Sequence, residues 1–271
     1  MFQTKVYWGS GMLLAIATAL VAYHTFPRRP PLQVRWAAQP QSDSPWLAFN
    51  SPQQVTGAHA EIMAALANVS HLKLTMVEVA TPQQRRALQN RTVDTAIENC
   101  RHGDAALLTS EPIFRREYWL LARRGDPRFS RPSPDRPWVW PAQPLVVGFM
   151  SNPTIEAALA QLPQFQSRAY PDMHPLPSLI DGYLDLMVAD QVWIIHALEV
   201  AEAPTPLVDK VQVVSGAIST EDQCFVVHRG HPTAATLVAT LNRALGRLKQ
   251  EGTLAKILEH WRISSAGQPL P

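Results

Sequence analysis

The stretch from Gln223 to Trp261 constrains the fold of this chain more than any other. It begins as a short apolar strand that runs into a basic turn. The following segment has leucines spaced four, four and three residues apart, so that they share one helix face: Leu237, Leu241, Leu245 and Leu248. We expect this helix to stop at Gly252 and Thr253 to cap a second, shorter helix. Periodicity alone predicts an α/β domain with a helical end.

The first 29 residues carry an uncharged, largely apolar segment, and we expect them to form a leader. No charged residue occurs from Val6 to Pro27, while Lys5 precedes this segment and Arg28 and Arg29 follow it. It is long enough to span a bilayer as a helix, which needs roughly 20 residues, and it also fits a cleaved signal peptide. A buried helix of a soluble core is a third interpretation, but the arginines and nearby prolines leave it nothing to pack on. Both favoured interpretations predict that the rest of the chain is exported.

Charge and length limit what the exported part can be. The net charge of the chain is +2, and the leader alone contributes three basic residues. No clustered basic field follows, so nucleic-acid binding is not expected. The remaining residues are numerous enough for one two-lobed domain with a sizeable core.

The exported part alternates between strand and helix patterns. Strands are expected at 32–37, 72–79, 93–99, 118–122, 145–149 and 186–189. Helices are expected at 60–67, from 81, at 154–161, at 178–183 and from 190. The segment 125–144 is rich in proline and charge, which is typical of a linker.

Two segments, one on each side of this linker, are similar to each other. LQNRTVDTAIEN and LIDGYLDLMVAD both run from a helix end through a turn into a strand, with Asp94 and Asp185 as the matching acids. Such an echo suits two similar lobes. Ligands of parallel α/β sheets bind beyond the carboxyl ends of the strands. We therefore expect Asn99, Cys100 and Asp190 to face a cleft between the lobes.

The chain resembles family 3 of the bacterial solute-binding proteins over roughly residues 32–262. The C-terminal region resembles the C-terminal signature of that family, which consists of a strand, a basic turn, a long helix, EGT, a short helix and HW. Further similar motifs occur in the family's order: SPWLAF at 44–49, VDTAI at 93–97, TSEPIF at 109–114, VGFMSNPT at 147–154 and VAD at 188–190.

The resemblance implies an α/β, two-lobed fold of the type II periplasmic-binding-protein class. Each lobe would be a mixed sheet flanked by helices, preceded here by the N-terminal apolar helix. Lobe 1 would comprise residues 30–124 and 219–263, lobe 2 would comprise 145–218, and 264–271 would be a tail. The protein would be periplasmic, either free or tethered to the inner membrane through an uncleaved leader.

The resemblance also implies ligand-binding residues, each with a purely structural alternative. Asp190 would grip a ligand ammonium, or would simply cap a helix. Ser151, Asn152 and Thr154 would present a helix start to a ligand carboxylate, or would be ordinary capping residues. Trp46 would form a wall of the cleft, or would pack in the core.

The sequence departs from the family at the carboxylate clamp. The arginine expected seven residues before Ser110 is replaced by Gly103, and Arg101 is the nearby arginine. Arg101 would bind the carboxylate through a different turn, with Asn99 beside it, or would be a solvated loop charge. The solute could therefore be an amino acid or another polar metabolite.

The two cysteines, Cys100 and Cys224, are candidates for one disulfide in an exported chain. In the resembled fold the strand that returns to lobe 1 lies beside the strand that ends at Cys100, which would bring the two thiols together. The alternative is two small buried apolar side chains.

Three function classes remain open. The first is a periplasmic protein that closes on a small polar solute and passes it to an ABC permease. The second is a membrane-tethered sensor or accessory domain without a transporter. The third is a dehydratase-like enzyme in the same cleft, with Glu98 as a candidate acid. No catalytic motif, metal-ligand spacing or cofactor motif occurs, so we expect no catalytic residues, no metal and no cofactor.

Overall fold

The structure, a computed structural model, describes residues 31–38, 45–51, 54–101, 103–129, 140–171, 174–199 and 209–266. Residues 33–271 form one compact unit. The leader expected at 1–29, residues 130–139 of the linker and the end of the tail lie outside the described residues. The prediction of a signal peptide or membrane anchor therefore concerns residues that the structure does not describe.

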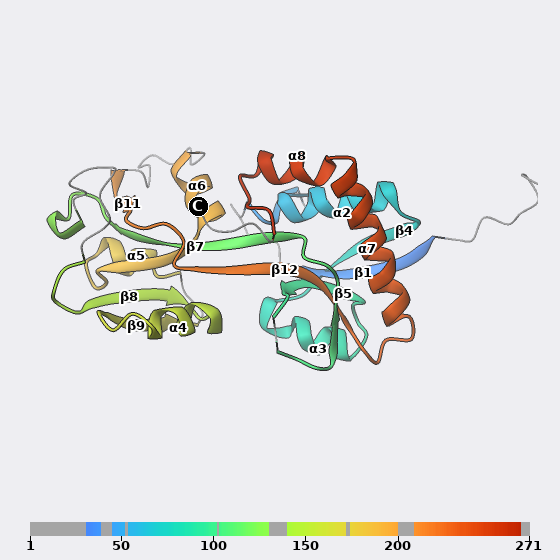
Figure 1. The fold of residues 1–271 in the computed structure, drawn as a ribbon, viewed down its shortest axis with the longest axis horizontal. Coiled ribbons are helices and arrows are strands. Elements are labelled where there is room, and N and C mark those ends of the chain that lie inside the picture. The colour runs from blue at the N-terminus through green and yellow to red at the C-terminus, as the bar shows by residue number, and fades with distance from the viewer. Residues whose placement is uncertain are drawn as a thin grey trace, which may run out of the picture. The chain divides into compact units, whose positions relative to one another are not determined.

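The described strands and helices alternate along most of the chain (Figure 1). The strands are β1 (Leu32–Ala38), β2 (Ala48–Ser51), β3 (Gln54–Thr56), β4 (Leu72–Glu78), β5 (Thr95–Asn99), β6 (Leu107–Thr109), β7 (Phe114–Arg123), β8 (Leu145–Met150), β9 (Phe165–Tyr170), β10 (Leu186–Asp190), β11 (Val211–Val213) and β12 (Ser219–His228). The α-helices are α2 (Ala58–Val69), α3 (Gln84–Gln89), α4 (Pro153–Ala160), α5 (Leu176–Ile180), α6 (Gln191–Glu199), α7 (Ala234–Gln250) and α8 (Thr253–His260), and short 3-10 turns are η1 (Thr81–Gln83) and η2 (Pro127–Phe129).

Ten of the described strands form one mixed sheet. Its main order is β4-β1-β5-β12-β7-β10-β8-β9, with β6 added to β12 and β11 added to β7. β1 and β5 are parallel, as are β10 with β8 and β8 with β9. β7 and β12 are antiparallel to each other and to their other neighbours.

The two long central strands divide this sheet into two lobes. We call lobe 1 the part with β1, β4, β5, β6 and helices α2, α3, α7 and α8, and lobe 2 the part with β8 to β11 and α4 to α6. The second half of β7 pairs with β10 and β11 of lobe 2, and the second half of β12 pairs with β5 and β6 of lobe 1. Figure 1 shows β7 and β12 lying side by side between the two groups. The fold is therefore the expected mixed α/β fold with two lobes.

The two lobes share one structural unit, as the similarity between the two sequence segments predicts. Asp94 accepts a hydrogen bond from the backbone N–H of Arg35 in β1 at 2.7 Å. Asp185 accepts one from the backbone N–H of Val146 in β8 at 2.8 Å. In return, the N–H of each acid donates to the carbonyl of the same partner. Each acid thus closes the pairing of two parallel strands at its start.

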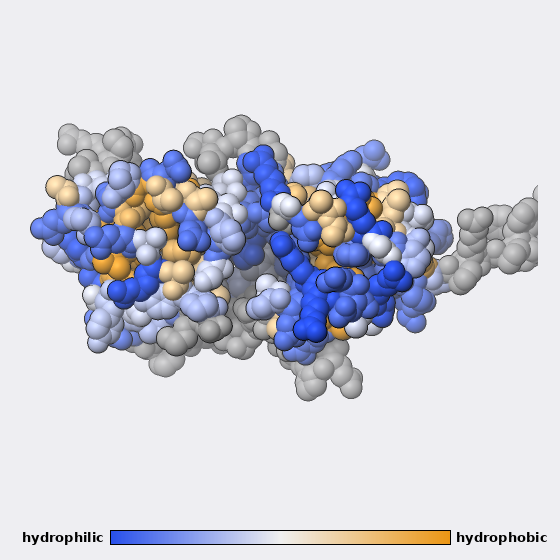
Figure 2. All heavy atoms as spheres, turned by 90° about the horizontal axis from the view of Figure 1, so that it is seen from below, coloured by the Kyte–Doolittle hydropathy of each residue, from blue (hydrophilic) through white to orange (hydrophobic). Residues whose placement is uncertain are grey.

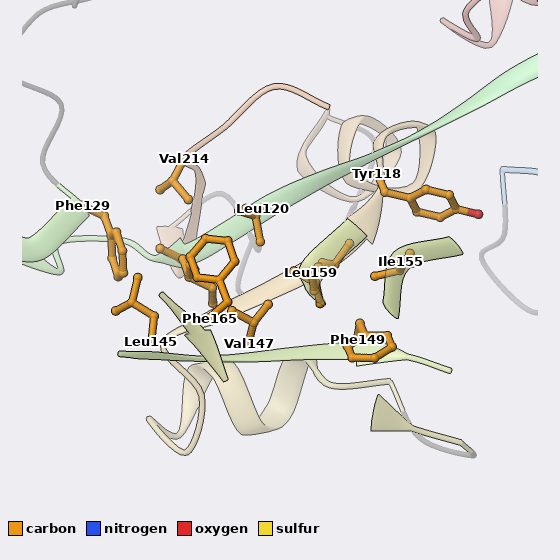
Figure 3. Close-up of a cluster of buried hydrophobic side chains, with 13 residues drawn as sticks. Tyr118, Leu120, Phe129, Leu145, Val147, Phe149, Ile155, Leu159, Phe165 and Val214 are labelled. Carbon is orange, nitrogen blue, oxygen red and sulfur yellow. The ribbon is translucent and has the colours of Figure 1, made fainter. Parts of the chain in front are cut away.

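A hydrophobic core in lobe 2 supports the strand ends that face lobe 1. Its buried side chains come from β7, β8, β10, α4 and the segments beside them (Figure 3). Tyr118 lies at one end of this cluster, and its hydroxyl points away from the other side chains. The cluster therefore holds the tyrosine ring in apolar surroundings and leaves the hydroxyl to polar partners.

Several elements differ from the sequence-based prediction. Five short strands, β2, β3, β6, β9 and β11, were not expected, and β7 and β12 are longer than predicted. The prediction that Thr253 caps the last helix is wrong. The cap position is Gly252, whose φ of 71° is left-handed, and no side chain caps the helix. Glycine suits this position because it adopts positive φ without strain.

Most large apolar side chains of the described residues are buried or partly buried. Among them, Met150 and Tyr183 are the exposed exceptions. Figure 2 shows one face on which hydrophilic residues predominate and apolar residues gather mostly in the left half. Within the described ranges, no helix combines the length and apolar character that crossing a membrane requires.

Candidate ligand-binding cavity

A cavity of about 410 Å³ lies between the two lobes. Small-ligand sites commonly have volumes of about 300–1,000 Å³. Lobe 1 lines it with Trp36, Ala37, Ala38, Trp46, Leu47, His59, Thr81, Gln84 and Ile97. Lobe 2 lines it with Met150, Ser151, Asn152, Ile155, His174, Val188, Ala189, Asp190 and Trp193, and β7 adds Arg116 and Tyr118. The wall is largely aromatic and aliphatic, with few charged groups.

The first turn of α2 holds Trp46 at the cavity. The backbone N–H groups of Ala58 and His59 donate to the carbonyls of Pro45 and Trp46 at 3.0 and 2.9 Å. Gly57 makes this approach feasible, since its φ is 109° and a Cβ there would lie 2.7 Å from the Trp46 carbonyl oxygen. A side chain at residue 57 would displace this loop, so glycine positions the indole indirectly.

Asp190, at the end of β10, is buried and fully engaged by the protein itself. Its Oδ1 accepts hydrogen bonds from the backbone N–H groups of Val192 at 2.9 Å and Trp193 at 3.2 Å, which cap α6. The same oxygen accepts a hydrogen bond from Trp46 Nε1 at 3.2 Å. Oδ2 accepts one from Arg116 Nε at 2.8 Å. The carboxylate therefore caps a helix of lobe 2 and also binds a tryptophan of lobe 1.

Arg116 supplies the cation of the cavity from the middle of the molecule. Its guanidinium carbon lies 5.0 Å from the centroid of Trp46 and 5.8 Å from that of Tyr118. Burial lowers the pKa of Arg116, but the negative charges of Asp190 and Glu221 and the nearby Tyr118 outweigh it and raise the pKa well above its usual range. The guanidinium therefore stays charged, paired with Asp190 and placed against two aromatic rings.

A hydrogen-bond chain behind this cation joins both lobes. Tyr118 donates to Glu221 Oε2 at 2.9 Å, and Asn152 Nδ2 donates to the Tyr118 hydroxyl at 3.3 Å. Gln223 Nε2 also donates to Glu221 Oε2, at 3.4 Å. Burial raises the pKa of Tyr118 well above its usual range; the positive charge of Arg116 opposes this rise, and the negative charges of Glu221 and Asp190 add to it. The phenol thus remains neutral and serves as a donor to the buried Glu221.

Two histidines add neutral rings to the wall. Burial and the positive charge of Arg116 lower the pKa of His59 to about 3. Its ring lies 5.4 Å from Trp46 and 5.7 Å from Phe114, centroid to centroid. Burial also lowers the pKa of His174, whose ring lies 4.5 Å from Trp193. At neutral pH both rings are uncharged, so they contribute surface and hydrogen bonding rather than charge.

Comparison with known proteins identifies the class to which this arrangement belongs. The model of the bacterial extracellular solute-binding proteins, family 3, matches residues 36–264. The chain belongs to this family. No curated protein sequence matches it.

Three solved structures are similar to this family 3 protein over most of its length. An arginine transport periplasmic binding protein from Legionella pneumophila has a TM-score of 0.66 and 14% identity, covering 85% of this chain and 99% of its own. The BvgS periplasmic VFT2 domain from Bordetella pertussis has a TM-score of 0.66 and 19% identity, covering 92% and 98%. The ancestral amino acid-binding protein AncCDT-1, a precursor of cyclohexadienyl dehydratase, has a TM-score of 0.62 and 20% identity, covering 84% and 94%. At these identities the likeness shows the shared fold.

The family 3 cavity brings together four of the seven predicted binding residues. Trp46, Ser151, Asn152 and Asp190 line it. Asn152 also caps α4, since its Oδ1 accepts from the N–H groups of Thr154 at 2.8 Å and Ile155 at 3.4 Å. Capping, which was the structural alternative at Asn152 and Asp190, is thus present at both positions.

The other three predicted residues lie outside the cavity wall. Asn99 Nδ2 donates to Thr154 Oγ1 at 3.3 Å, so these two side chains join the lobes directly. Arg101 is exposed, and its backbone N–H donates to Asn99 Oδ1 at 2.8 Å. The turn keeps Arg101 at the surface, and Arg116 is the arginine of the cavity.

A disulfide joins Cys100 to Cys224, with 5.1 Å between their Cα atoms. The register of β12 on β5 explains the pairing, because Cys224 lies opposite Glu98 near the end of β5. The alternative of two unlinked apolar thiols does not describe this structure. The disulfide links residues 124 apart in the sequence.

Sequence reasoning missed the residues that give the cavity its charge and hydrogen bonding, notably Arg116, Tyr118 and His59. The only available signal was FRREYWLLA at 114–122, where charged residues begin an otherwise apolar strand. Glu98, the acid considered for an enzyme, pairs with Arg85 at 3.3 Å and does not line the cavity. Across the described ranges, no three His, Cys, Asp or Glu side chains gather as a metal site would require.

Proposed function

We propose that this family 3 protein captures one small solute in the cavity between its lobes and passes it to an ABC permease of the inner membrane. The observation that carries the proposal is a cavity of ligand size to which both lobes and β7 contribute walls. A solute held there would contact both lobes at once and so favour their closed arrangement. The protein would act in the periplasm, either free or tethered through its N-terminal segment.

The proposal assigns residues 30–124 and 219–263 to lobe 1 and 145–218 to lobe 2, with 125–144 as the linker. Trp46, Ser151, Asn152 and Asp190 would lie at the solute, together with Arg116 and Tyr118. The relatives named for amino-acid and arginine binding support a small polar solute. The aromatic wall favours a solute with a ring or another flat apolar part.

A thermal-shift screen of the full-length protein tests solute capture. A compound present at 100 times its dissociation constant should stabilise the fold by about 2.7 kcal/mol. Ser151→Trp places a large side chain at the cavity wall and should abolish the shift. Ser167→Trp, at an exposed position of β9, is the matched control and should keep it. A shift that survives Ser151→Trp unchanged would place binding elsewhere.

A sensor or accessory role is the second candidate, and one observation favours it. The lobes already bind each other through Trp46 with Asp190 and Asn99 with Thr154, using protein groups alone. A domain that reports its own closure to a membrane partner could use such contacts. N-terminal sequencing of the exported protein separates the candidates, because removal of the leader supports a free receptor and its retention supports a tethered sensor.

Enzyme activity is not part of the proposal. The relative described as a precursor of cyclohexadienyl dehydratase is itself an ancestral amino acid-binding protein. Incubating the protein with a captured compound and analysing that compound afterwards would reveal any turnover. Recovery of unchanged compound is the expected result.

A further inference from the structure

The two charged side chains that line the cavity wall are paired with each other. Among the described residues of its wall, Asp190 is the one acid and Arg116 the one permanent cation, and they are bonded to each other. His59 and His174 are neutral rings at neutral pH. A ligand cation at the wall would find its one carboxylate, Asp190, already paired, and the other nearby acid, buried Glu221, lies behind the wall and is hydrogen-bonded by Tyr118 and Gln223. Neither acid is free to replace the hydration of the cation, which makes its burial unfavourable.

Asp190 cannot accept a ligand ammonium without giving up a partner. Three donors already converge on Oδ1, and the short contact at Oδ2 belongs to Arg116. Displacing Arg116 would leave its guanidinium without its anion inside the cavity. The geometry therefore protects this carboxylate from ligand cations.

The aromatic wall is likewise partly occupied by the same arginine. Aromatic faces attract ligand cations when they are vacant. Here the Arg116 guanidinium lies against Trp46 and Tyr118 at 5.0 and 5.8 Å. A second cation at these rings would meet the positive charge of Arg116 at close range, where like charges repel strongly.

The groups left for a ligand are hydrogen-bond donors. Among the described residues, the Nη atoms of Arg116 have no hydrogen-bond partner, and about a third of its side chain is exposed. His174 Nδ1 accepts from the Leu176 N–H at 3.4 Å, which leaves Nε2 as the protonated nitrogen of a neutral ring. Both residues line the cavity and are suited to oxygen acceptors such as a carboxylate, carbonyl or amide.

We infer that Arg116 determines specificity: it occupies Asp190 as an internal cation, so the cavity takes ring-bearing molecules with oxygen acceptors and rejects those with an ammonium group. This inference rests on the proposed capture of a solute in this cavity. It narrows the solute from polar metabolites in general to molecules that lack an amine, and it separates this chain from a receptor for free amino acids.

Four compounds with one phenyl ring test the inference by calorimetric titration of the full-length protein. They are 3-phenylpropanoate, 3-phenylpropanamide, L-phenylalanine and 2-phenylethylamine, which differ in whether they carry a carboxylate, an amide or an ammonium. We expect the first two to bind at least about tenfold more tightly than the two amines. In Arg116→Gln, Asp190 loses its cation. The affinity for L-phenylalanine divided by the affinity for 3-phenylpropanoate should therefore be at least about tenfold higher than in the wild type.

Two further variants test whether the added affinity for L-phenylalanine comes from the carboxylate of Asp190. Arg116→Gln combined with Asp190→Asn should lose the added affinity for L-phenylalanine, and Arg168→Gln, at an exposed position of β9, should keep the wild-type order. Tighter binding of L-phenylalanine than of 3-phenylpropanoate by the wild type would overturn the inference while leaving solute capture intact. Failure of all four compounds with both the wild type and Arg116→Gln would also overturn it, and the broader screen with Ser151→Trp would then judge capture separately.

Discussion

At the scale of single residues, Asp94 joins three parts of lobe 1. It accepts hydrogen bonds from the backbone N–H and the guanidinium of Arg35, the shortest at 2.7 Å, and lies 3.2 Å from His231 Nε2. It is buried, whereas the Arg35 side chain is about half exposed. An anion in this position stabilises the parallel pairing of β1 with β5 and the turn before α7.

We predict that Asp94→Asn lowers the free energy of unfolding by about 1–3 kcal/mol, because one charged acceptor is replaced by a neutral amide among buried donors. Urea denaturation at pH 7 measures this loss. Asp181→Asn, an exposed acid after α5, is the matched control and should change stability by less than about 0.5 kcal/mol. An equal effect of both substitutions would contradict the role given to Asp94.

The contribution of Asp94 should also depend on pH. Burial opposes ionisation, but hydrogen bonds from Arg35 outweigh it and hold the pKa of Asp94 below its usual range. A carboxyl whose pKa is lowered by folding adds stability above its unfolded pKa and loses it as the pH falls through the folded value. The difference between wild type and Asp94→Asn should therefore stay constant from pH 8 to about 5 and shrink below about pH 4. A difference that grows on acidification would contradict this.

At the scale of elements, the disulfide connects the end of β5 to β12. Linking distant residues restricts the unfolded chain, which typically adds about 2–4 kcal/mol. We predict that a reductant lowers the free energy of unfolding by this amount in the wild type and has no effect on the double variant Cys100→Ser with Cys224→Ser. Urea denaturation with and without dithiothreitol measures both. Mass spectrometry that finds two free thiols in protein prepared without reductant would contradict the prediction.

Elements with a strong pattern were predictable from the sequence, and those defined by their neighbours were not. The leucines along one face of α7 predicted this helix, and six of its residues are buried. β9 begins with one buried residue and continues with four exposed ones, so it lacks the alternation that marks a strand. It is a strand because it pairs with β8. That pairing is a tertiary contact, which the sequence of β9 alone does not reveal.

The same division applies to the candidate site. Asp190 ends a strand of a parallel pair and lines the cavity, where the rule that ligands lie beyond strand ends predicted it. Asn152 was expected there from the family resemblance and its place before a helix. Arg116 and Tyr118 lie within β7, where they reach the cavity because β7 pairs with both β12 and β10. That register is not visible in a single sequence, so the arginine was sought at residue 101 instead.

At the scale of the whole molecule, the cavity depends on contacts between the lobes. Trp46 Nε1 donates to Asp190 Oδ1 from lobe 1 to lobe 2 at 3.2 Å. Removing this donor should favour separation of the lobes, by about 0.5–1.5 kcal/mol for one hydrogen bond. The other contacts, including Asn99 with Thr154, would remain.

We therefore predict that Trp46→Phe, which keeps an aromatic ring without the N–H, increases the radius of gyration of the ligand-free protein. Small-angle X-ray scattering measures this value. Trp140→Phe is the matched control, because Trp140 packs against the core of lobe 2, and its radius should equal that of the wild type. An unchanged radius in Trp46→Phe would show that this bond does not hold the lobes together.

The disulfide also has a mechanical consequence for the molecule. β12 pairs with β7 from Ser219 to Gln223 and with β5 from Gln223 onward. The bond to Cys100 fastens β12 to lobe 1 at this junction. Any bending of β12 between the lobes is therefore confined to the few residues before Cys224. In the proposed opening and closing of the lobes, oxidation of the two thiols would shorten the flexible length of one of the two connecting strands, so the redox state of the compartment would set the stiffness of that motion.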